Sequence, residues 1–247
     1  MLKITAVKYI NTLPFIKAIQ SSERLQNNVE LITADPKDCA LSLLHNKSDL
    51  VLLPVGAISD FSRLYCQLDY CIACYNDVGT VGIFSNQEWD SIKTIKLSPS
   101  SRSSNLLLNT LNTHFLDNQF ELLDAQSNVQ DASLIIGDEA FLAKSKFKNY
   151  FDLGNIWKQK TGQSFVFAIW VSQVPLPDEI IKELNTVFSN YTSHVALEKL
   201  ANELDENNFN VLHYFHHQMR YNLDKELKDS LQFFLELNNF NSDLLYT

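Results

Sequence analysis

The sequence predicts an α/β protein whose sheets are mostly parallel. Short apolar stretches with strand character alternate with amphipathic stretches of helical length through most of the 247 residues. The stretch Leu50-Val-Leu-Leu-Pro-Val55 is apolar without a break, which is typical of a strand covered on both faces. The same alternation begins again near residue 95, so we expect a second α/β unit.

The first unit alternates strands and helices from its beginning. Pro14 and Pro36 suit the first turn of a helix, and Asp35 suits the N-cap of the second helix. The expected helices cover residues 14–22, 35–46 and 57–62. The expected strands cover residues 3–9, 29–33, 50–55, 69–75 and 80–85.

The second unit has the same alternation, and the chain then returns through a strongly apolar segment and becomes helical. We expect strands at residues 95–97, 120–123, 132–136 and 165–171. We expect helices at residues 103–112, 193–204 and 224–237, and another that begins at Pro177. This order predicts two lobes: residues 1–85 with 170–247, and residues 86–169.

A cleft between the two lobes is the expected ligand site. Ligands of open α/β sheets bind outside the carboxyl ends of the strands, and domain interfaces are favoured positions for pockets. Four segments lie at predicted strand ends: residues 9–14, 54–57, 98–104 and 137–139. We therefore expect these four segments to converge.

Composition and charge exclude some classes of protein. The net charge is −9 and no run of Lys or Arg is present, which argues against a nucleic-acid partner. No apolar run approaches the ~20 residues that a membrane helix needs, so we expect no membrane partner. The N-terminus runs from Met1 directly into a strand pattern without a leader, which favours a cytoplasmic location.

The four cysteines are expected to be free thiols. Cys66, Cys71 and Cys74 have the spacing of three ligands of an iron–sulfur cluster, but no fourth cysteine follows them. The last two lie in a predicted strand, where a buried cysteine behaves as a small apolar residue. We expect neither a metal site nor a cofactor.

The segment Ser98-Pro-Ser-Ser-Arg-Ser-Ser104 is the strongest candidate for an anion site. It joins a predicted strand to a predicted helix, where the first turn has unpaired N–H groups and a partial positive charge. Hydroxyl groups and a guanidinium placed there suit a carboxylate or a phosphate. The alternatives are plain helix capping by one serine and a surface ion pair of Arg102.

Six motifs in order make the chain similar to a known family. They are Tyr9-Ile-Asn-Thr-Leu-Pro14, Leu53-Pro-Val55, Leu97-Ser-Pro-Ser-Ser-Arg-Ser-Ser104, Ile135-Ile-Gly-Asp-Glu-Ala140, Asp152-Leu-Gly154 and Trp157-Lys-Gln-Lys-Thr-Gly-Gln-Ser-Phe-Val-Phe-Ala-Ile-Trp170. The chain resembles chorismate dehydratase of the futalosine route to menaquinone, over about residues 3–240. The resemblance implies a two-lobed fold of the type II periplasmic-binding-protein kind. It also implies cofactor-free dehydration of chorismate to 3-[(1-carboxyvinyl)oxy]benzoate.

The resemblance also indicates which residues meet the substrate. Ser100, Ser101, Arg102, Ser103 and Ser104 are expected to hold a carboxylate of chorismate. The loop after Pro-Val often carries two serines in that family, and this chain has Gly56 and Ala57 there. We expect that loop to touch the substrate, with two hydroxyl contacts missing. Phe165, together with Phe167 and Trp170, is expected to wall the pocket, although core packing is the commoner role of such rings.

Two further positions are candidates for catalysis. Asn11, with Thr12 beside it, is expected to orient the 4-hydroxyl or a carboxylate, and a helix-capping role ahead of Pro14 is the alternative. Asp138 follows an apolar strand and Gly137, so it is the candidate base, with capping of the next helix as its alternative. The enolpyruvyl carboxylate of the substrate is a further candidate for the base.

Two other functions stay open from the sequence. One is a non-catalytic binding protein for a small organic anion, because the fold alone does not separate binding from catalysis. The other is the related 1,4-dihydroxy-6-naphthoate synthase, although its first-strand motif is expected to differ. The C-terminal helices would either pair two chains in a homodimer or cover the first lobe.

Overall fold

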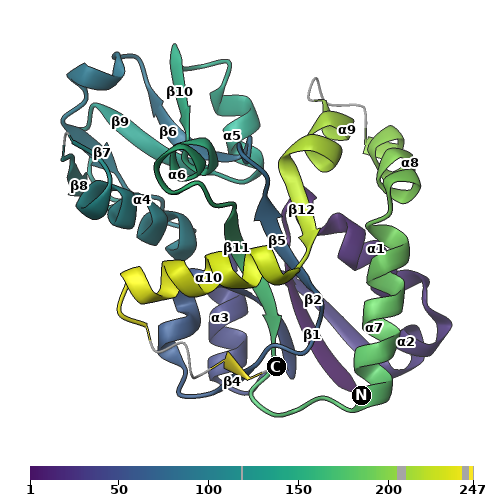
Figure 1. The fold of residues 1–247 in the computed structure, drawn as a ribbon. Helices are drawn as coiled ribbons and strands as arrows, with labels where there is room; N and C mark the ends of the chain where they lie inside the picture. The colour runs from purple at the N-terminus through teal and green to yellow at the C-terminus, as the bar shows by residue number, and fades with distance from the viewer. Residues whose placement is uncertain (118, 205–209, 241–244, 247) are drawn as a thin grey trace.

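The chain forms two lobes, each built on its own β-sheet with helices packed against it (Figure 1). The computed structural model describes residues 1–117, 119–204, 210–240 and 245–246. The first sheet has the strand order β12-β5-β11-β3-β1-β2, and the second has the order β10-β6-β9-β7-β8. The α/β class expected from the sequence is confirmed.

The strands of the first sheet come from both ends of the chain, and those of the second sheet come from its middle. The first sheet contains β1 (Leu2–Val7), β2 (Val29–Ala34), β3 (Leu50–Pro54), β5 (Tyr70–Cys74), β11 (Phe165–Val171) and β12 (Met219–Asn222). The second sheet contains β6 (Val81–Ser85), β7 (Thr94–Lys96), β8 (Glu121–Leu123), β9 (Ala132–Ile136) and β10 (Asn149–Asp152). A small separate sheet pairs β4 (Leu64–Tyr65) with β13 (Leu245–Tyr246).

Both large sheets are mixed, so the expectation of mostly parallel sheets is corrected. β1 pairs in parallel with β2 and β3, and β7 pairs in parallel with β8 and β9. β11, however, runs antiparallel between β3 and β5. The chain leaves the first lobe at the carboxyl end of β5 and re-enters at the same edge through β11. A strand that begins at the end of the sheet where its neighbour finishes must run antiparallel to that neighbour.

The two crossings between lobes lie a few residues earlier than expected. The outgoing crossing is the segment 75–80, because β6 already belongs to the second sheet. The returning crossing is the segment 162–164, because all of β11 belongs to the first sheet. An apolar strand pattern does not reveal which sheet the strand joins, so the sequence did not locate these points.

Helices connect the strands and pack against the two sheets. They are α1 (Leu13–Ser21), α2 (Glu23–Asn28), α3 (Pro36–Leu44), α4 (Arg102–His114), α5 (Asp138–Ala143), α6 (Leu153–Thr161), α7 (Asp178–Tyr191), α8 (His194–Leu204), α9 (Val211–His213) and α10 (Lys225–Leu237). Three 3-10 turns are η1 (Ile10–Thr12), η2 (Val55–Asp60) and η3 (Trp89–Ser91), and η4 (Tyr214–Gln218) is a π-helical turn. The expected helix at 57–62 is thus the 3-10 turn η2.

Aromatic rings fill the core on both sides of the first sheet. Beneath α1 and α7, Trp170 stacks on Phe188 with ring centroids 5.4 Å apart, and Phe15 meets Trp170 edge to face at 5.7 Å. On the other side, Trp157 of α6 and Phe234 of α10 pack around β11, 5.7 Å apart. These contacts tie α6, which follows the second sheet, to the first lobe.

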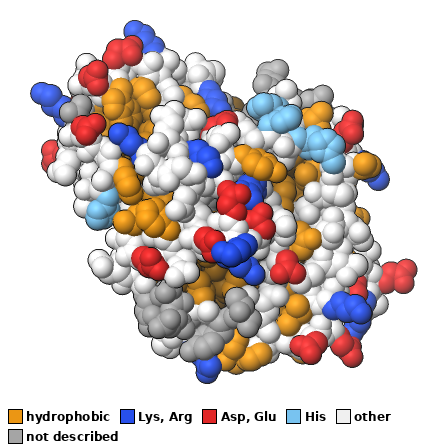
Figure 2. Space-filling model, viewed as in Figure 1, with side chains coloured by type: hydrophobic (Ala, Val, Ile, Leu, Met, Phe, Trp, Pro, Cys, Tyr) orange, Lys and Arg blue, Asp and Glu red, His pale blue; other side chains and the backbone are white. Residues whose placement is uncertain are grey.

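Charges of both signs are interspersed on the surface. The face seen in Figure 2 mixes Lys and Arg with Asp and Glu, and histidines gather near α8 and α9. Within the described residues, no helix is long and apolar enough to cross a membrane.

Candidate functional site

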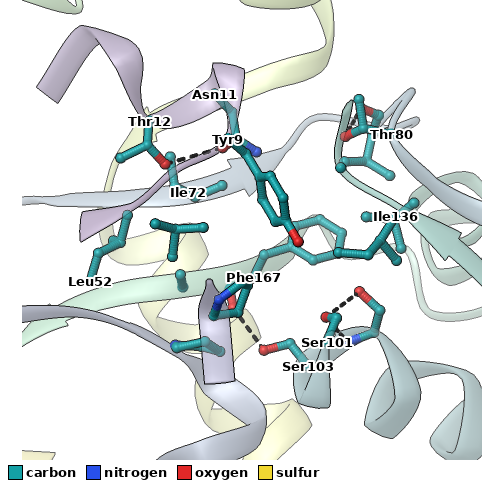
Figure 3. Close-up of a pocket in the computed structure, with 18 residues that line it drawn as sticks. Tyr9, Asn11, Thr12, Leu52, Ile72, Thr80, Ser101, Ser103, Ile136 and Phe167 are labelled. Carbon is teal, nitrogen blue, oxygen red and sulfur yellow. Dashed lines mark hydrogen bonds between the residues drawn. The ribbon is translucent and has the colours of Figure 1, made fainter. Parts of the chain in front are cut away.

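A pocket lies between the two sheets, and all four of the expected strand-end segments contribute to it (Figure 3). It contains about 520 Å³ of space outside protein atoms, part of it open to solvent. Polar side chains lie around an apolar floor. The polar lining residues are Tyr9, Asn11, Thr12, Thr80, Ser101, Ser103 and Ser104, and the apolar ones include Val7, Leu52, Pro54, Ile72, Ile136 and Phe167. The expected convergence is confirmed.

The turn after β1 supplies the wall of the first lobe. β1 ends at Val7 and the chain turns through η1 into α1, whose first turn contains Pro14. Asn11 and Thr12 therefore face the pocket from a short rigid turn, as expected. The Thr12 hydroxyl donates to Oδ1 of Asn11 over 3.2 Å, which fixes one side of the amide.

The start of α4 supplies the opposite wall. Ser101 is the N-cap: its Oγ accepts the N–H of Ser104 at 3.2 Å and donates to Oγ of Ser104 at 2.9 Å. Ser103 donates to the carbonyl of Phe167 at 3.0 Å and accepts the N–H of Gly56 at 3.1 Å. The capping role and the pocket role of the serine segment are thus both present. Among the described hydrogen bonds, the hydroxyl hydrogen of Ser104 has no acceptor and is available to a ligand.

Arg102 does not line the pocket. Its Nη2 lies 2.8 Å from Oδ1 of Asp60, and its Nη1 binds Oδ2 of the same carboxylate. This contact with Asp60 raises the pKa of the guanidinium. Arg102 and Ser100 line a different hollow, on the outer side of the serine segment, together with Lys37 of α3. The surface ion pair, which was the alternative for Arg102, is the arrangement found.

Four other residues that were expected to touch the substrate or wall the pocket are also absent from its lining: Gly56, Ala57, Phe165 and Trp170. Gly56 and Ala57 are buried under α4, and a Cβ on Gly56 would lie 2.6 Å from the carbonyl carbon of Arg102. Glycine is therefore needed there for the close approach of α4. Phe165 is buried among aromatic rings, 4.8 Å from Phe234, and Phe167 is the ring that reaches the pocket.

Asp138 lies at the rim and joins the two lobes. Its Oδ1 accepts the N–H of Ile10 at 3.3 Å, and it is not among the lining residues. Partial desolvation raises the pKa of this carboxyl, against a smaller lowering by the Ile10 hydrogen bond. Next to it, Gly137 has φ +63° and a Cβ there would lie 2.8 Å from the Tyr9 ring. Tyr9 and Ile10 thus meet the second lobe at two adjacent residues.

The polar side chains of the pocket lining are uncharged. Among the described residues that line the pocket, none is Asp, Glu, Lys, Arg or His. Tyr9 is the titratable lining residue, and burial raises its pKa above the ordinary value despite a hydrogen bond with Ser100. At neutral pH the phenol is therefore protonated. The described hydrogen bonds leave the hydroxyls of Tyr9 and Ser104 and the amide nitrogen of Asn11 as donors for a ligand, and the α4 N-terminus adds a partial positive charge.

Sequence reasoning missed Tyr9 and Thr80 as lining side chains. Tyr9 is the first residue of the motif Tyr9-Ile-Asn-Thr-Leu-Pro14, so the motif could have indicated that its side chain lines the pocket. Thr80 belongs to the outgoing crossing, and its role depends on the contact between lobes that only the fold reveals.

The cysteines are free and buried, as expected. Burial raises the pKa of both Cys39 and Cys66 to about 12, so these thiols are unreactive at neutral pH. Within the described part of the chain, no group of three or more His, Cys, Asp or Glu residues is placed to hold a metal ion.

Comparison with known proteins adds a family and a fold. A family model described as menaquinone biosynthesis matches residues 2–239. A probable polyketide synthase of Dictyostelium discoideum is 33% identical over 93 residues, which are 35% of this chain and 3% of that protein. The chain thus spans a very small part of that relative.

Three solved structures have a similar fold at low sequence identity. Protein AF1704 from Archaeoglobus fulgidus has a TM-score of 0.73 at 13% identity, with 96% of each chain covered. The Candida albicans CA3427 gene product, described as having the generic periplasmic binding protein fold, has a TM-score of 0.67 at 13% identity, with 99% and 92% covered. The alkanesulfonate-binding protein SsuA from Xanthomonas axonopodis pv. citri, bound to MOPS, has a TM-score of 0.62 at 14% identity, with 99% and 97% covered. The expected periplasmic-binding-protein-like fold is confirmed.

Proposed function

Because this chain belongs to the menaquinone-biosynthesis family, we propose that it is a lyase that dehydrates chorismate to 3-[(1-carboxyvinyl)oxy]benzoate. Chorismate has a cyclohexadiene ring, two carboxylates and a 4-hydroxyl. The apolar floor of the pocket suits the ring, and the neutral donors around it suit the oxygens. The observation that carries the proposal is this pairing of an apolar floor with hydroxyls at a helix N-terminus, inside a chain of this family.

The reaction removes a proton from C3 and hydroxide from C4, which together make one molecule of water and leave an aromatic ring. Charge from the C3–H bond spreads through the ring diene onto the ring carboxylate. We place that carboxylate at the start of α4, where the partial positive charge of the helix and the free hydroxyl hydrogen of Ser104 stabilise it. The first turn of α4 is fixed before the substrate arrives, because Ser101 caps it and Ser103 is bound to Phe167 and Gly56.

Among the described residues that line the pocket, none has a side chain suited to act as the base. Asp138 is not among the described lining residues, one of its oxygens accepts the Ile10 N–H, and Tyr9 is a protonated donor. We therefore assign the base to the enolpyruvyl carboxylate of the substrate, which is attached through the ether oxygen at C3. The protein then contributes position, which converts proton removal into an intramolecular step.

Asn11 is the residue that we assign to the departing hydroxide. Its Oδ1 is occupied by Thr12, so its amide nitrogen is the group that faces a ligand as donor. A hydrogen bond from this amide to the 4-hydroxyl would strengthen as the C4–O bond breaks and negative charge grows on oxygen. The mechanism thus uses the start of α4 at the ring carboxylate and the Asn11 amide at the 4-hydroxyl.

Turnover of chorismate by the purified protein tests the proposal. We expect an aromatic product lighter than chorismate by one water molecule, detected by chromatography and mass above the spontaneous background. Asn11→Ala is expected to lower kcat by about 100-fold, the usual cost of one lost transition-state donor. Asn28→Ala is the control, because Asn28 is exposed on α2 and its amide binds the carbonyl of Arg24.

Two results would contradict the proposal. If chorismate is recovered unchanged while it stabilises the protein against heat, the chain is a binding protein for an organic anion. If chorismate neither reacts nor stabilises the protein, chorismate is not its substrate.

A further inference from the structure

A buried tyrosine lies behind the pocket and reaches two of its polar residues. Tyr214 begins the π-helical turn η4, just before β12, and it is fully buried. Its ring meets Phe141 of α5 edge to face, with centroids 5.7 Å apart. Tyr214 therefore contacts the second lobe although its own segment continues into the first sheet. Its hydroxyl lies between Asn11 of the first lobe and Thr80 of the outgoing crossing.

The hydroxyl of Tyr214 has two polar neighbours that line the pocket. It lies 3.2 Å from Oγ1 of Thr80, and it forms a second hydrogen bond with the side chain of Asn11. The Thr80 hydroxyl donates in turn to the carbonyl of Val78, over 3.5 Å. Either hydroxyl can be the donor between Tyr214 and Thr80, and the contact of Thr80 with the Val78 carbonyl favours donation by Tyr214. The Tyr214 oxygen then accepts an N–H of Asn11.

This order of donors fixes which way the Asn11 amide points. Thr12 donates to Oδ1 of Asn11 from one side, and Tyr214 accepts from Nδ2 on the other side. Figure 3 shows the amide with its oxygen toward Thr12 and its nitrogen away from Thr12. An amide nitrogen has two hydrogens, so one is left for a ligand. A flipped amide would place its oxygen against Tyr214 and its nitrogen against the Thr12 hydroxyl.

We infer that Tyr214 is a positioning residue, which holds the Asn11 amide so that one N–H is presented to the ligand in the pocket. The role rests on the proposed function, because there Asn11 is the donor to the leaving 4-hydroxyl. Tyr214 itself does not line the pocket. It acts through Asn11, and its link to Thr80 connects the orientation of the amide to the crossing between the lobes.

Tyr214→Phe is the direct test, because it removes the hydroxyl and keeps the buried ring. We expect kcat for chorismate to fall about fivefold to tenfold with KM nearly unchanged, since one fixed hydrogen bond behind a catalytic donor is lost. The matched control is Tyr221→Phe on β12. Tyr221 is also buried, with 6% of its surface exposed, but its hydroxyl has no hydrogen-bond partner in the described part of the chain, so kcat should not change.

A double-mutant cycle separates positioning from a general structural effect. In an Asn11→Ala background, Tyr214→Phe should cause no further loss of kcat, because the group that it orients is gone. If Tyr214→Phe lowers kcat by the same factor with and without Asn11, or not at all, the inference is wrong. Thermal unfolding of each variant shows whether the fold is intact.

A measurement without turnover keeps this inference separate from the proposed function. The side-chain amide protons of Asn11, assigned by their disappearance in Asn11→Ala, can be followed by NMR in the unliganded protein. We expect Tyr214→Phe to shift both signals and speed their exchange with water, whereas Tyr221→Phe should not. Unchanged Asn11 signals in Tyr214→Phe would overturn the inference even if chorismate is the substrate. If the wild type does not convert chorismate but the signals shift, the proposed function fails and the positioning role stands.

Discussion

Single residues decide how a pocket without charged side chains can receive a dianion. The described lining presents hydroxyls, amides and one protonated phenol, and the nearest arginine at the α4 start is neutralised by Asp60. Neutral donors that are already oriented lose little on binding, because their partners hold them before the ligand arrives. Because no described lining residue is charged, proton removal is also left without a side-chain base.

Asp138→Asn tests whether the rim carboxylate takes part in catalysis. Asparagine keeps an oxygen that can accept the Ile10 N–H, so the contact between lobes should survive. We expect kcat within about twofold of the wild type, since our account gives Asp138 no proton to move. Steady-state kinetics with chorismate measures this. A loss of 100-fold or more, about the size expected for a lost general base, would return the base to Asp138.

For single residues, the sequence predicted which segments lie at the pocket better than it predicted which side chains point into it. The serine segment was identifiable because N-cap chemistry leaves a local pattern. The direction of Arg102 depends on Asp60, which is distant in sequence, so the local pattern carried no signal for it. The choice between Phe165 and Phe167 depends on an irregularity of pairing between Val166 and Ala168 in β11, and such a bulge re-aims side chains.

At the scale of elements, the close contact between η2 and α4 holds the serine wall in place. Gly56 lies against the backbone at Arg102 and Ser103, and its N–H binds Oγ of Ser103. Gly56→Ala should push α4 outward and cost about 1–3 kcal/mol of unfolding free energy, as overpacking does. Urea unfolding measures the loss, and kcat should fall with it. Wild-type stability together with wild-type kcat would show that α4 does not depend on this contact.

The contact between η4 and α8 is expected to make the stability of the protein depend on pH. His216 of η4 stacks on His194 of α8 with ring centroids 3.7 Å apart, and His217 and Glu198 are its other charged or titratable neighbours. Burial, and then His194, lower the pKa of His216 below its ordinary value of about 6.5. The unfolded chain therefore binds the proton more readily. Stability from this group is complete above about pH 6.5 and is lost as the pH falls.

His216→Asn tests this dependence. We expect the variant to lose less unfolding free energy than the wild type between about pH 7.5 and pH 5.5, because it has no proton to bind there. His45→Asn, at the exposed end of α3, is the control and should keep the wild-type difference. If His216→Asn and the wild type show the same pH dependence, another group causes it.

Most long elements were predictable from periodicity, and the short ones were not. β10 has four residues and no alternation to detect, and η4 is a π-helical turn with no sequence signature. α6 was missed although both of its ends carry signals: Asp152 caps it through the Asn155 N–H, and Gly162 ends it with φ +75°. The same Asp152 accepts the N–H groups of Val78 and Gly79, so it also anchors the outgoing crossing.

At the scale of the whole molecule, the chain passes twice between two lobes and encloses its pocket where it crosses. Tyr9 against Gly137 and Ile10 against Asp138 join the lobes beside the pocket. The solved structures with this fold share 13–14% sequence identity with the chain, which supports the architecture and leaves the chemistry to the site. The family match links the chain to menaquinone biosynthesis.

Comparing chorismate with an analogue whose enolpyruvyl carboxylate is a primary amide tests the central claim most directly. The account predicts that the protein converts chorismate to the aromatic enolpyruvyl benzoate, and that the amide binds without measurable turnover because it lacks the base. Equal turnover of the two compounds would contradict the account and require a base from the protein. Binding of both without turnover of either would contradict catalysis itself.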